Sequence, residues 1–108
     1  MKIYNKLVRD KIPEIIKASG AHCETKILTG LEYLDALEAK LDEELAEYHE
    51  SGDIEELADL LEVIYAITQE NGYSIQQLFC KRALKAERRG HFTKRIMLLS
   101  VEEVTEDA

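Results

Sequence analysis

Hydrophobic residues in the middle of the chain follow helical spacing. From Leu31 to Tyr48 they step by three and four positions, which predicts an amphipathic helix over residues 31–51. Asp53 has a side chain suited to the N-cap of a second helix over 54–70. Only a short turn separates the two segments, and a short connection favours an antiparallel helical hairpin.

Other elements flank this hairpin. The spacing predicts a third long helix over 75–88 and a short helix or turn over 10–18. Residues 22–28 and 94–101 have β-branched or apolar side chains and little helical period, so we expect two short strands that pair with each other. We find no internal repeat or linker. The pattern therefore predicts a single domain over 1–108, an all-α helical bundle with a minor two-stranded β element.

The second predicted helix has a wide apolar arc. At 100° per residue, its apolar side chains fill roughly 220° of the circumference, which predicts a central position in the fold. Glu55, Glu62 and Gln69 fall together outside this arc and form the solvent face. Glu56 falls inside the arc and Asp59 lies at its edge. Burying an unpaired carboxylate costs folding free energy or forces the group to take up a proton, so Glu56 needs a positively charged or hydrogen-bonding partner.

The first predicted helix carries carboxylates in a matching position. Glu44 borders its apolar stripe directly, and Glu47 and Lys40 lie just beyond Glu44 on the same side. In an antiparallel hairpin, Glu44 and Glu47 can face Glu56 and Asp59, so that four carboxylates converge. Either these are solvated faces with salt bridges to Lys40 and to arginines of the third helix, or they bind a hard divalent cation, most simply Mg²⁺.

The charges are unevenly distributed along the chain. Residues 27–80 hold fourteen Asp and Glu residues and a single base, Lys40, whereas the other thirteen bases lie in residues 1–26 and 81–95. The lack of bases near Glu56 in sequence favours the cation. The formal net charge of −8 argues against a general nucleic-acid binder.

The composition indicates an ordered globular chain. The 108 residues are 45% hydrophobic and 33% charged, which is enough to bury a core without disulfides or metals. No stretch approaches the length of a membrane span, and the N-terminus does not resemble a secretory signal. We therefore expect a cytoplasmic protein, without a membrane partner, in which Cys23 and Cys80 are reduced thiols.

Several motifs carry a resemblance to a known family. The stretches "KLDEELAEY" and "EELADLLEVI" resemble the E-E-x-x-E and E-x-x-D motifs of the MazG-like all-α nucleoside triphosphate pyrophosphohydrolases. The stretches "YNKLVRDKIPEII" and "KAERRGHF" are similar to the ends of a small single-domain branch, the phosphoribosyl-ATP pyrophosphohydrolase-like proteins. The motifs occur in order and cover residues 3–99.

The resemblance implies a helical bundle that binds Mg²⁺, with Mn²⁺ as a substitute, and hydrolyses a nucleotide between its α- and β-phosphates. The products would be a monophosphate and pyrophosphate. The family's metal ligands correspond to Glu44, Glu47, Glu56 and Asp59. Glu44 or Glu47, at the edge of the site, would orient or deprotonate the attacking water.

The basic ends then have an expected role in binding the polyphosphate, since guanidinium and ammonium groups suit phosphate oxygens. The candidate substrate-binding residues are Lys6, Arg9, Lys11, Lys40, Arg82, Lys85, Arg88 and Arg89. Their alternative role is to pair with the acidic helices.

We also expect a homo-oligomer, with a dimer favoured. The alternative function is a catalytically weak nucleotide-binding protein or a helical interaction module that uses the acidic face. The identity of the base and sugar stays open at this point, as does the choice between house-cleaning and phosphoribosyl-ATP hydrolysis.

Overall fold

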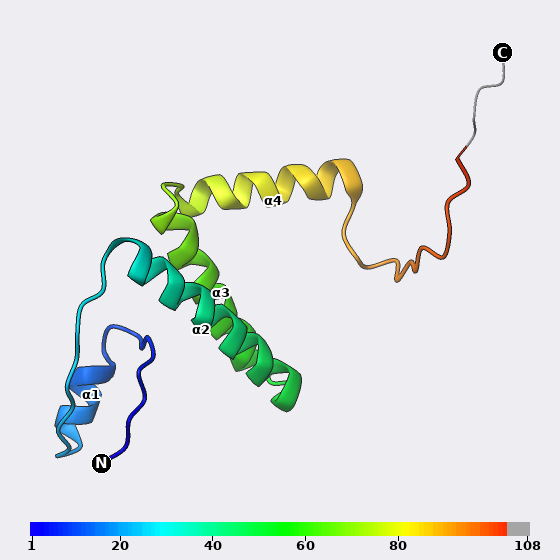
Figure 1. Cartoon of the computed structure of the whole chain (residues 1–108). Coiled ribbons are helices and arrows are strands. Elements are labelled where there is room, and N and C mark those ends of the chain that lie inside the picture. Colours follow the sequence, from blue (N-terminus) through cyan, green and yellow to red (C-terminus); the bar gives the residue numbers. More distant parts are fainter. Residues whose placement is uncertain (104–108) are drawn as a thin grey trace. The chain divides into compact units, whose positions relative to one another are not determined.

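The computed structural model describes residues 1–103, which form four α-helices (Figure 1). The helices are α1 (Ile12–Ala18), α2 (Gly30–Ser51), α3 (Ile54–Glu70) and α4 (Ile75–Arg89). The all-α fold class is thus confirmed, and the three long helices begin and end within about one residue of the ranges that the spacing predicts.

The predicted two-stranded element is wrong. Neither 22–28 nor 94–101 forms a strand, and no residue within 1–103 does. In the second segment, Ile96 and Leu99 are 80% and 89% exposed. Strand preference reflects packing on a half-buried pleated surface, and without such a surface the apolar composition alone does not form a ladder.

The chain divides into two compact units, Met1–Ile75 and the part from Gln76 onward. The first unit contains α1, α2 and α3, and the second contains nearly all of α4 with the segment that follows it. The prediction of a single domain over the whole chain stays a prediction.

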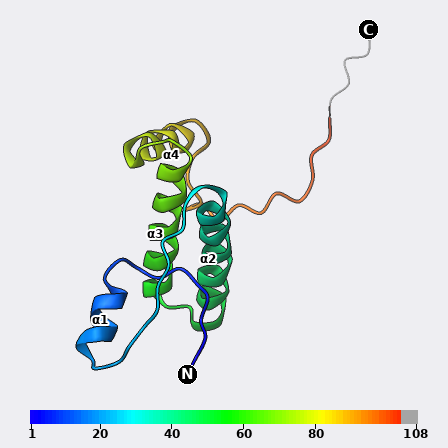
Figure 2. The same cartoon turned by 60° about the vertical axis from the view of Figure 1, so that its left-hand side comes forward.

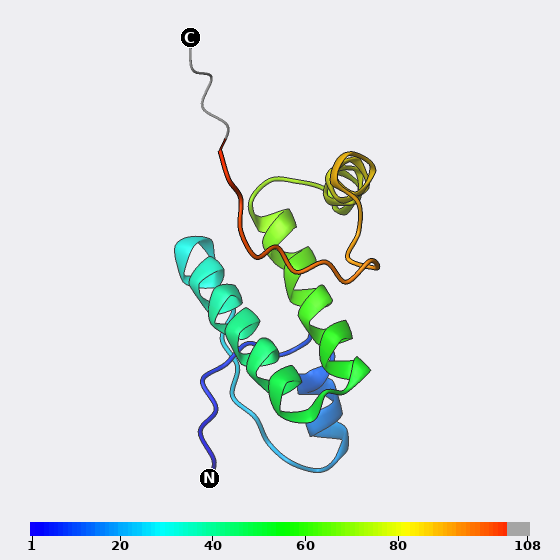
Figure 3. The ribbon, with the colours of Figure 1, turned by 90° about the vertical axis from the view of Figure 1, so that its right-hand side faces the viewer.

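The first unit is built on the antiparallel pair α2 and α3, which lie side by side in two views (Figures 2 and 3). Gly52 ends α2 in the left-handed conformation, with φ of 67°, and its N–H donates to the Tyr48 carbonyl at 2.8 Å. Glycine adopts this conformation without the strain of a Cβ atom. Asp53 then caps α3 by accepting from the Glu55 N–H at 3.1 Å, which confirms its predicted role.

The core between these helices is small. Leu37 of α2 and Val63 of α3 are the buried apolar residues of the part of the chain that the structure describes, at 4% and 8% exposure. Part of the apolar arc of α3 stays uncovered, with Ile54, Leu57 and Leu61 at 73%, 40% and 44% exposure. Within the first unit α2 is the helix that packs on α3. Within this unit one side of the arc has no partner helix, and the predicted central position of α3 in the fold stays a prediction.

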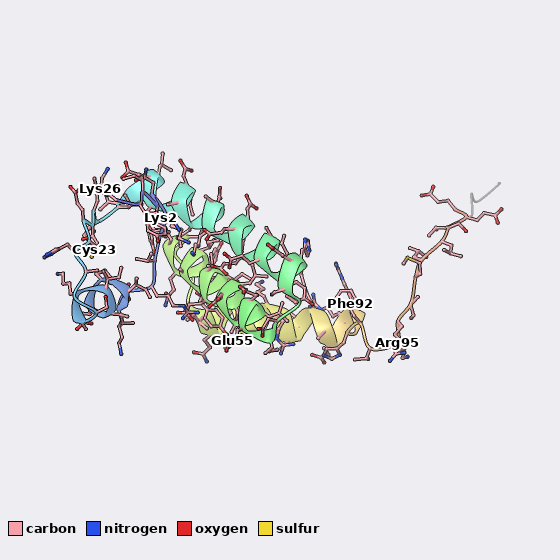
Figure 4. All side chains as sticks on the ribbon, turned by 90° about the horizontal axis from the view of Figure 1, so that it is seen from below. Lys2, Cys23, Lys26, Glu55, Phe92 and Arg95 are labelled. Atoms are coloured by element: carbon pink, nitrogen blue, oxygen red, sulfur yellow. The ribbon has the colours of Figure 1, made fainter. Side chains whose placement is uncertain are left out.

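The solvent face of α3 agrees with the prediction. Glu55, Glu62 and Gln69 are all exposed. Figure 4 shows Glu55 on the side of α3 that faces away from α2. This face supplies control positions for the experiments below.

The second unit carries α4 and an extended segment. The segment exposes a run of apolar side chains that includes Phe92, Ile96 and Leu99. None of the helices within residues 1–103 combines the length and the apolar character needed to cross a membrane.

Candidate metal centre

Three carboxylates of the hairpin converge on one point. Glu44 comes from α2, whereas Glu56 and Asp59 come from α3. One carboxylate oxygen of each residue lies within 4.8 Å of the corresponding oxygens of the other two. Spacing of three residues places Glu56 and Asp59 on one helix face, and the antiparallel turn brings Glu44 opposite them. We call these three residues the carboxylate cluster.

Glu44 is the most deeply buried charged residue of the described chain, at 5% exposure. One of its oxygens, Oε1, lies 3.2 Å from the Lys40 Nζ, one helical turn earlier. The other, Oε2, is buried, and no described residue forms a hydrogen bond with it. The Oε2 atom of Glu56 is likewise buried, and no described residue forms a hydrogen bond with it. Buried polar atoms in folded proteins normally have a partner, so two unpartnered oxygens in one cluster need an explanation.

Burial and neighbouring carboxylates raise the pKa values of two members of the cluster. Burial raises the pKa of Glu44; the Lys40 ammonium opposes this shift, and the charges of Glu47 and Asp59 add to it. Burial also raises the pKa of Glu56, and a hydrogen bond with the Glu47 carboxyl raises it further. Glu47, the fourth predicted ligand, is a charged neighbour of Glu44 and Glu56 but is not one of the three residues whose oxygens converge.

Basic side chains surround the cluster without filling it. Lys40 also approaches the Glu43 Oε1 at 3.5 Å, and Lys6 lies 3.1 Å from that same oxygen. Arg9 contacts the cluster itself, with its Nη2 2.7 Å from the Asp59 Oδ1. None of these contacts reaches the unpartnered Oε2 atoms of the cluster.

Glu43 has a role that the helical pattern did not indicate. Burial opposes its ionisation, but hydrogen bonds from Lys6 and Lys40 outweigh this effect and lower the pKa of Glu43. In return, the hydrogen bond with Glu43 raises the pKa of Lys6. Lys40 and Glu43 are three residues apart on one helix, so the sequence predicts their ion pair. No sequence pattern predicts the ion pair between Lys6 and Glu43.

The structure brings together most of the predicted site in the first unit. Lys11 is exposed at the N-cap of α1. The remaining candidates lie on α4, in the second unit, and their contact with substrate stays a prediction. These residues are Arg82, Lys85, Arg88 and Arg89. The alternative of plain ion pairing accounts for Glu43 and Asp59 but not for the unpartnered oxygens of Glu44 and Glu56.

Comparison with known proteins adds little about chemistry. No family model matches the chain, and no solved structure matches it. One relative is an uncharacterized protein of Mycolicibacterium smegmatis, 58% identical over 41 residues. The match covers 38% of this chain and 42% of the relative, so it spans less than half of either.

Proposed function

We propose that this protein is a Mg²⁺-dependent nucleotide pyrophosphohydrolase. It cleaves a nucleoside triphosphate, or a related nucleotide, between the α- and β-phosphates to give a monophosphate and pyrophosphate. The observation that carries the proposal is the buried, unpartnered Oε2 of Glu44 beside two further carboxylates. The resemblance of the motifs to MazG-like pyrophosphohydrolases supports the choice of reaction.

The carboxylate cluster fits a hard divalent cation. Magnesium binds oxygen ligands at about 2.1 Å, so two oxygens on opposite sides of one ion lie about 4.2 Å apart. Three ligands of one octahedral ion include at least two adjacent pairs, whose oxygens lie about 3.0 Å apart. The cluster oxygens lie within 4.8 Å of one another, so they would draw closer together on binding an ion. Glu44, Glu56 and Asp59 would hold the ion. When bound, Mg²⁺ neutralises phosphate charge and polarises the bond that breaks.

We assign the activation of water to Glu47. Glu44 binds Lys40 through Oε1 and is one of the three residues whose carboxylate oxygens converge. Glu47 is half-buried and adjoins the cluster through Glu56, so it lies beside a bound ion without being one of its three converging ligands. A carboxylate in this position can accept a proton from the attacking water.

The basic residues offset the charge of the substrate. A triphosphate brings about four negative charges to an already acidic surface, which is favourable only with cations nearby. Lys40 contacts Glu44, and Arg9 contacts Asp59, so both lie at the rim of the cluster. We expect both to reach the polyphosphate, with the bases of α4 as further candidates.

We propose that the enzyme acts as a cytoplasmic homo-oligomer, with a dimer favoured. The uncovered arc of α3, formed by Ile54, Leu57 and Leu61, supports association, since exposed apolar patches mark interaction surfaces. Cys23 and Cys80 are both free thiols, the state expected in a reducing compartment.

The proposal is tested with a panel of nucleoside triphosphates and phosphoribosyl-ATP, assayed for pyrophosphate release with Mg²⁺. We expect release from at least one nucleotide, with the matching monophosphate as second product. The Glu44→Gln variant is the negative control for contaminating activity. Binding of a nucleotide without pyrophosphate release would favour the catalytically weak binding protein instead.

A further inference from the structure

Arg9 forms an ion pair with Asp59, which is one ligand of the proposed cation site. We infer, on the basis of that proposed site, that the Arg9 guanidinium takes the place of the divalent cation at Asp59 in the metal-free protein. Binding of the cation then releases Arg9, which becomes available to the phosphates of the nucleotide. Arg9 is thus a substrate-binding residue whose contacts depend on the metal.

Arg9 and a metal in the cluster would share the Asp59 carboxylate. Its Nη2 lies 2.7 Å from the Asp59 Oδ1, the shortest ion pair within residues 1–103. Asp59 is also one of the three residues whose oxygens converge in the carboxylate cluster. A guanidinium and a divalent cation repel each other strongly at such separations, so Asp59 does not hold both at full strength.

The pair is also weak enough to exchange. The Arg9 and Asp59 side chains are 57% and 39% exposed. Exposed ion pairs contribute little to stability because water screens them and because long side chains lose entropy on pairing. The carboxylate cluster, by contrast, contains two buried oxygens for which the described chain offers no partner. A divalent cation satisfies those oxygens, whereas Arg9 does not reach them.

A second contact keeps the released Arg9 close to the site. Lys6 lies 3.1 Å from the Glu43 Oε1, and Glu43 is not a member of the carboxylate cluster. On the other side, the Arg9 carbonyl accepts the Ile12 N–H at 3.0 Å at the start of α1. Both anchors persist when Asp59 binds a metal. The free guanidinium therefore stays near the bound ion, with the planar geometry that suits bidentate contact with phosphate.

The test measures Mn²⁺ binding to the full chain without nucleotide, by electron paramagnetic resonance of the free ion. We expect Arg9→Gln to bind Mn²⁺ about 1.5- to fivefold more tightly than the unmodified protein, the range that an exposed ion pair corresponds to. Lys6→Gln is the matched control, since it removes the same charge from a neighbouring pair outside the cluster, and a clearly smaller gain is expected.

Steady-state kinetics supply a second readout with the opposite sign. Because Arg9→Gln loses a charged hydrogen bond to phosphate, its KM for the nucleotide should rise about tenfold, with a smaller change in kcat. Arg9→Lys should restore Mn²⁺ affinity close to that of the unmodified protein and only part of the KM. Loss of a nearby positive charge also acts through space in these two directions, and the comparison with Lys6→Gln separates that effect from exchange at Asp59.

Equal Mn²⁺ affinity in Arg9→Gln and the unmodified protein would overturn the inference, as would an equal gain in Lys6→Gln. If hydrolysis persists in that case, the proposed function stands. If competition is observed but no nucleotide is hydrolysed, the exchange at Asp59 stands and the proposed function fails. Absence of Mn²⁺ binding in every variant would overturn both. Far-ultraviolet circular dichroism confirms that each variant is folded.

Discussion

Replacing Glu44 by glutamine distinguishes a cation site from a structural ion pair. The substitution keeps the size of the side chain and removes its charge at a position with 5% exposure. An amide retains one oxygen for Lys40, at the place where Oε1 now accepts at 3.2 Å. Its NH₂ group replaces the unpartnered Oε2, so the variant no longer buries an oxygen without a hydrogen-bond donor at this position.

The free energy of unfolding should therefore change in opposite directions without and with metal. Without metal, the amide removes an unsatisfied buried acceptor, worth about 1–3 kcal/mol, but weakens the contact with Lys40. We expect a net stabilisation of about 1 kcal/mol or no change. With Mg²⁺ at one hundred times Kd, the unmodified protein gains about 2.7 kcal/mol by binding. The variant lacks one anionic ligand and gains much less, so the order of stability reverses.

The assay is urea unfolding followed by circular dichroism, once in EDTA and once in excess Mg²⁺. Glu55→Gln is the matched control, because Glu55 is an exposed carboxylate of α3 that points away from α2 (Figure 4). It should leave both unfolding curves nearly unchanged. If metal-free Glu44→Gln is destabilised by about 3–5 kcal/mol, Glu44 and Lys40 form a structural buried pair and the reasoning is refuted.

Four further outcomes are expected. Chelation by excess EDTA should abolish pyrophosphate release, and turnover that persists in EDTA would exclude a metal from the mechanism. Mg²⁺ or Mn²⁺ should raise the Tm of the protein by binding to the folded state. Glu56→Gln should nearly eliminate turnover because an amide is a neutral, poorer ligand, whereas Glu62→Gln on the solvent face should not. Burial raises the pKa of Glu44 above 4.5 in the folded state, so its ionised form destabilises the metal-free fold. The stability gained by Glu44→Gln should therefore shrink as pH falls through that raised pKa. A gain in stability that grows on acidification would contradict the assignment. Arg82→Ala, on α4, should raise KM more than it lowers the urea midpoint, and the reverse would assign this residue to the fold.

The sequence by itself determined the helices and the chemistry of the cluster. Gly52 and Asp53 form a short turn, which favours an antiparallel arrangement of α2 and α3. Helical spacing then leaves little freedom in where Glu44 and Glu56 point. Local geometry with a fixed period is readable from a single chain, because each residue's direction follows from its neighbours.

The tertiary structure decided which cations meet which carboxylates. Lys6 reaches Glu43 across 37 positions of the sequence, and Arg9 reaches Asp59 across 50. Such contacts depend on the path of the segment before α1 rather than on any periodic pattern. The failure of 94–101 to form a strand has the same origin, since a strand requires a partner backbone that spacing along one chain does not specify. Long-range pairing is a property of the folded chain, and here it places Arg9 on a ligand of the proposed cation site.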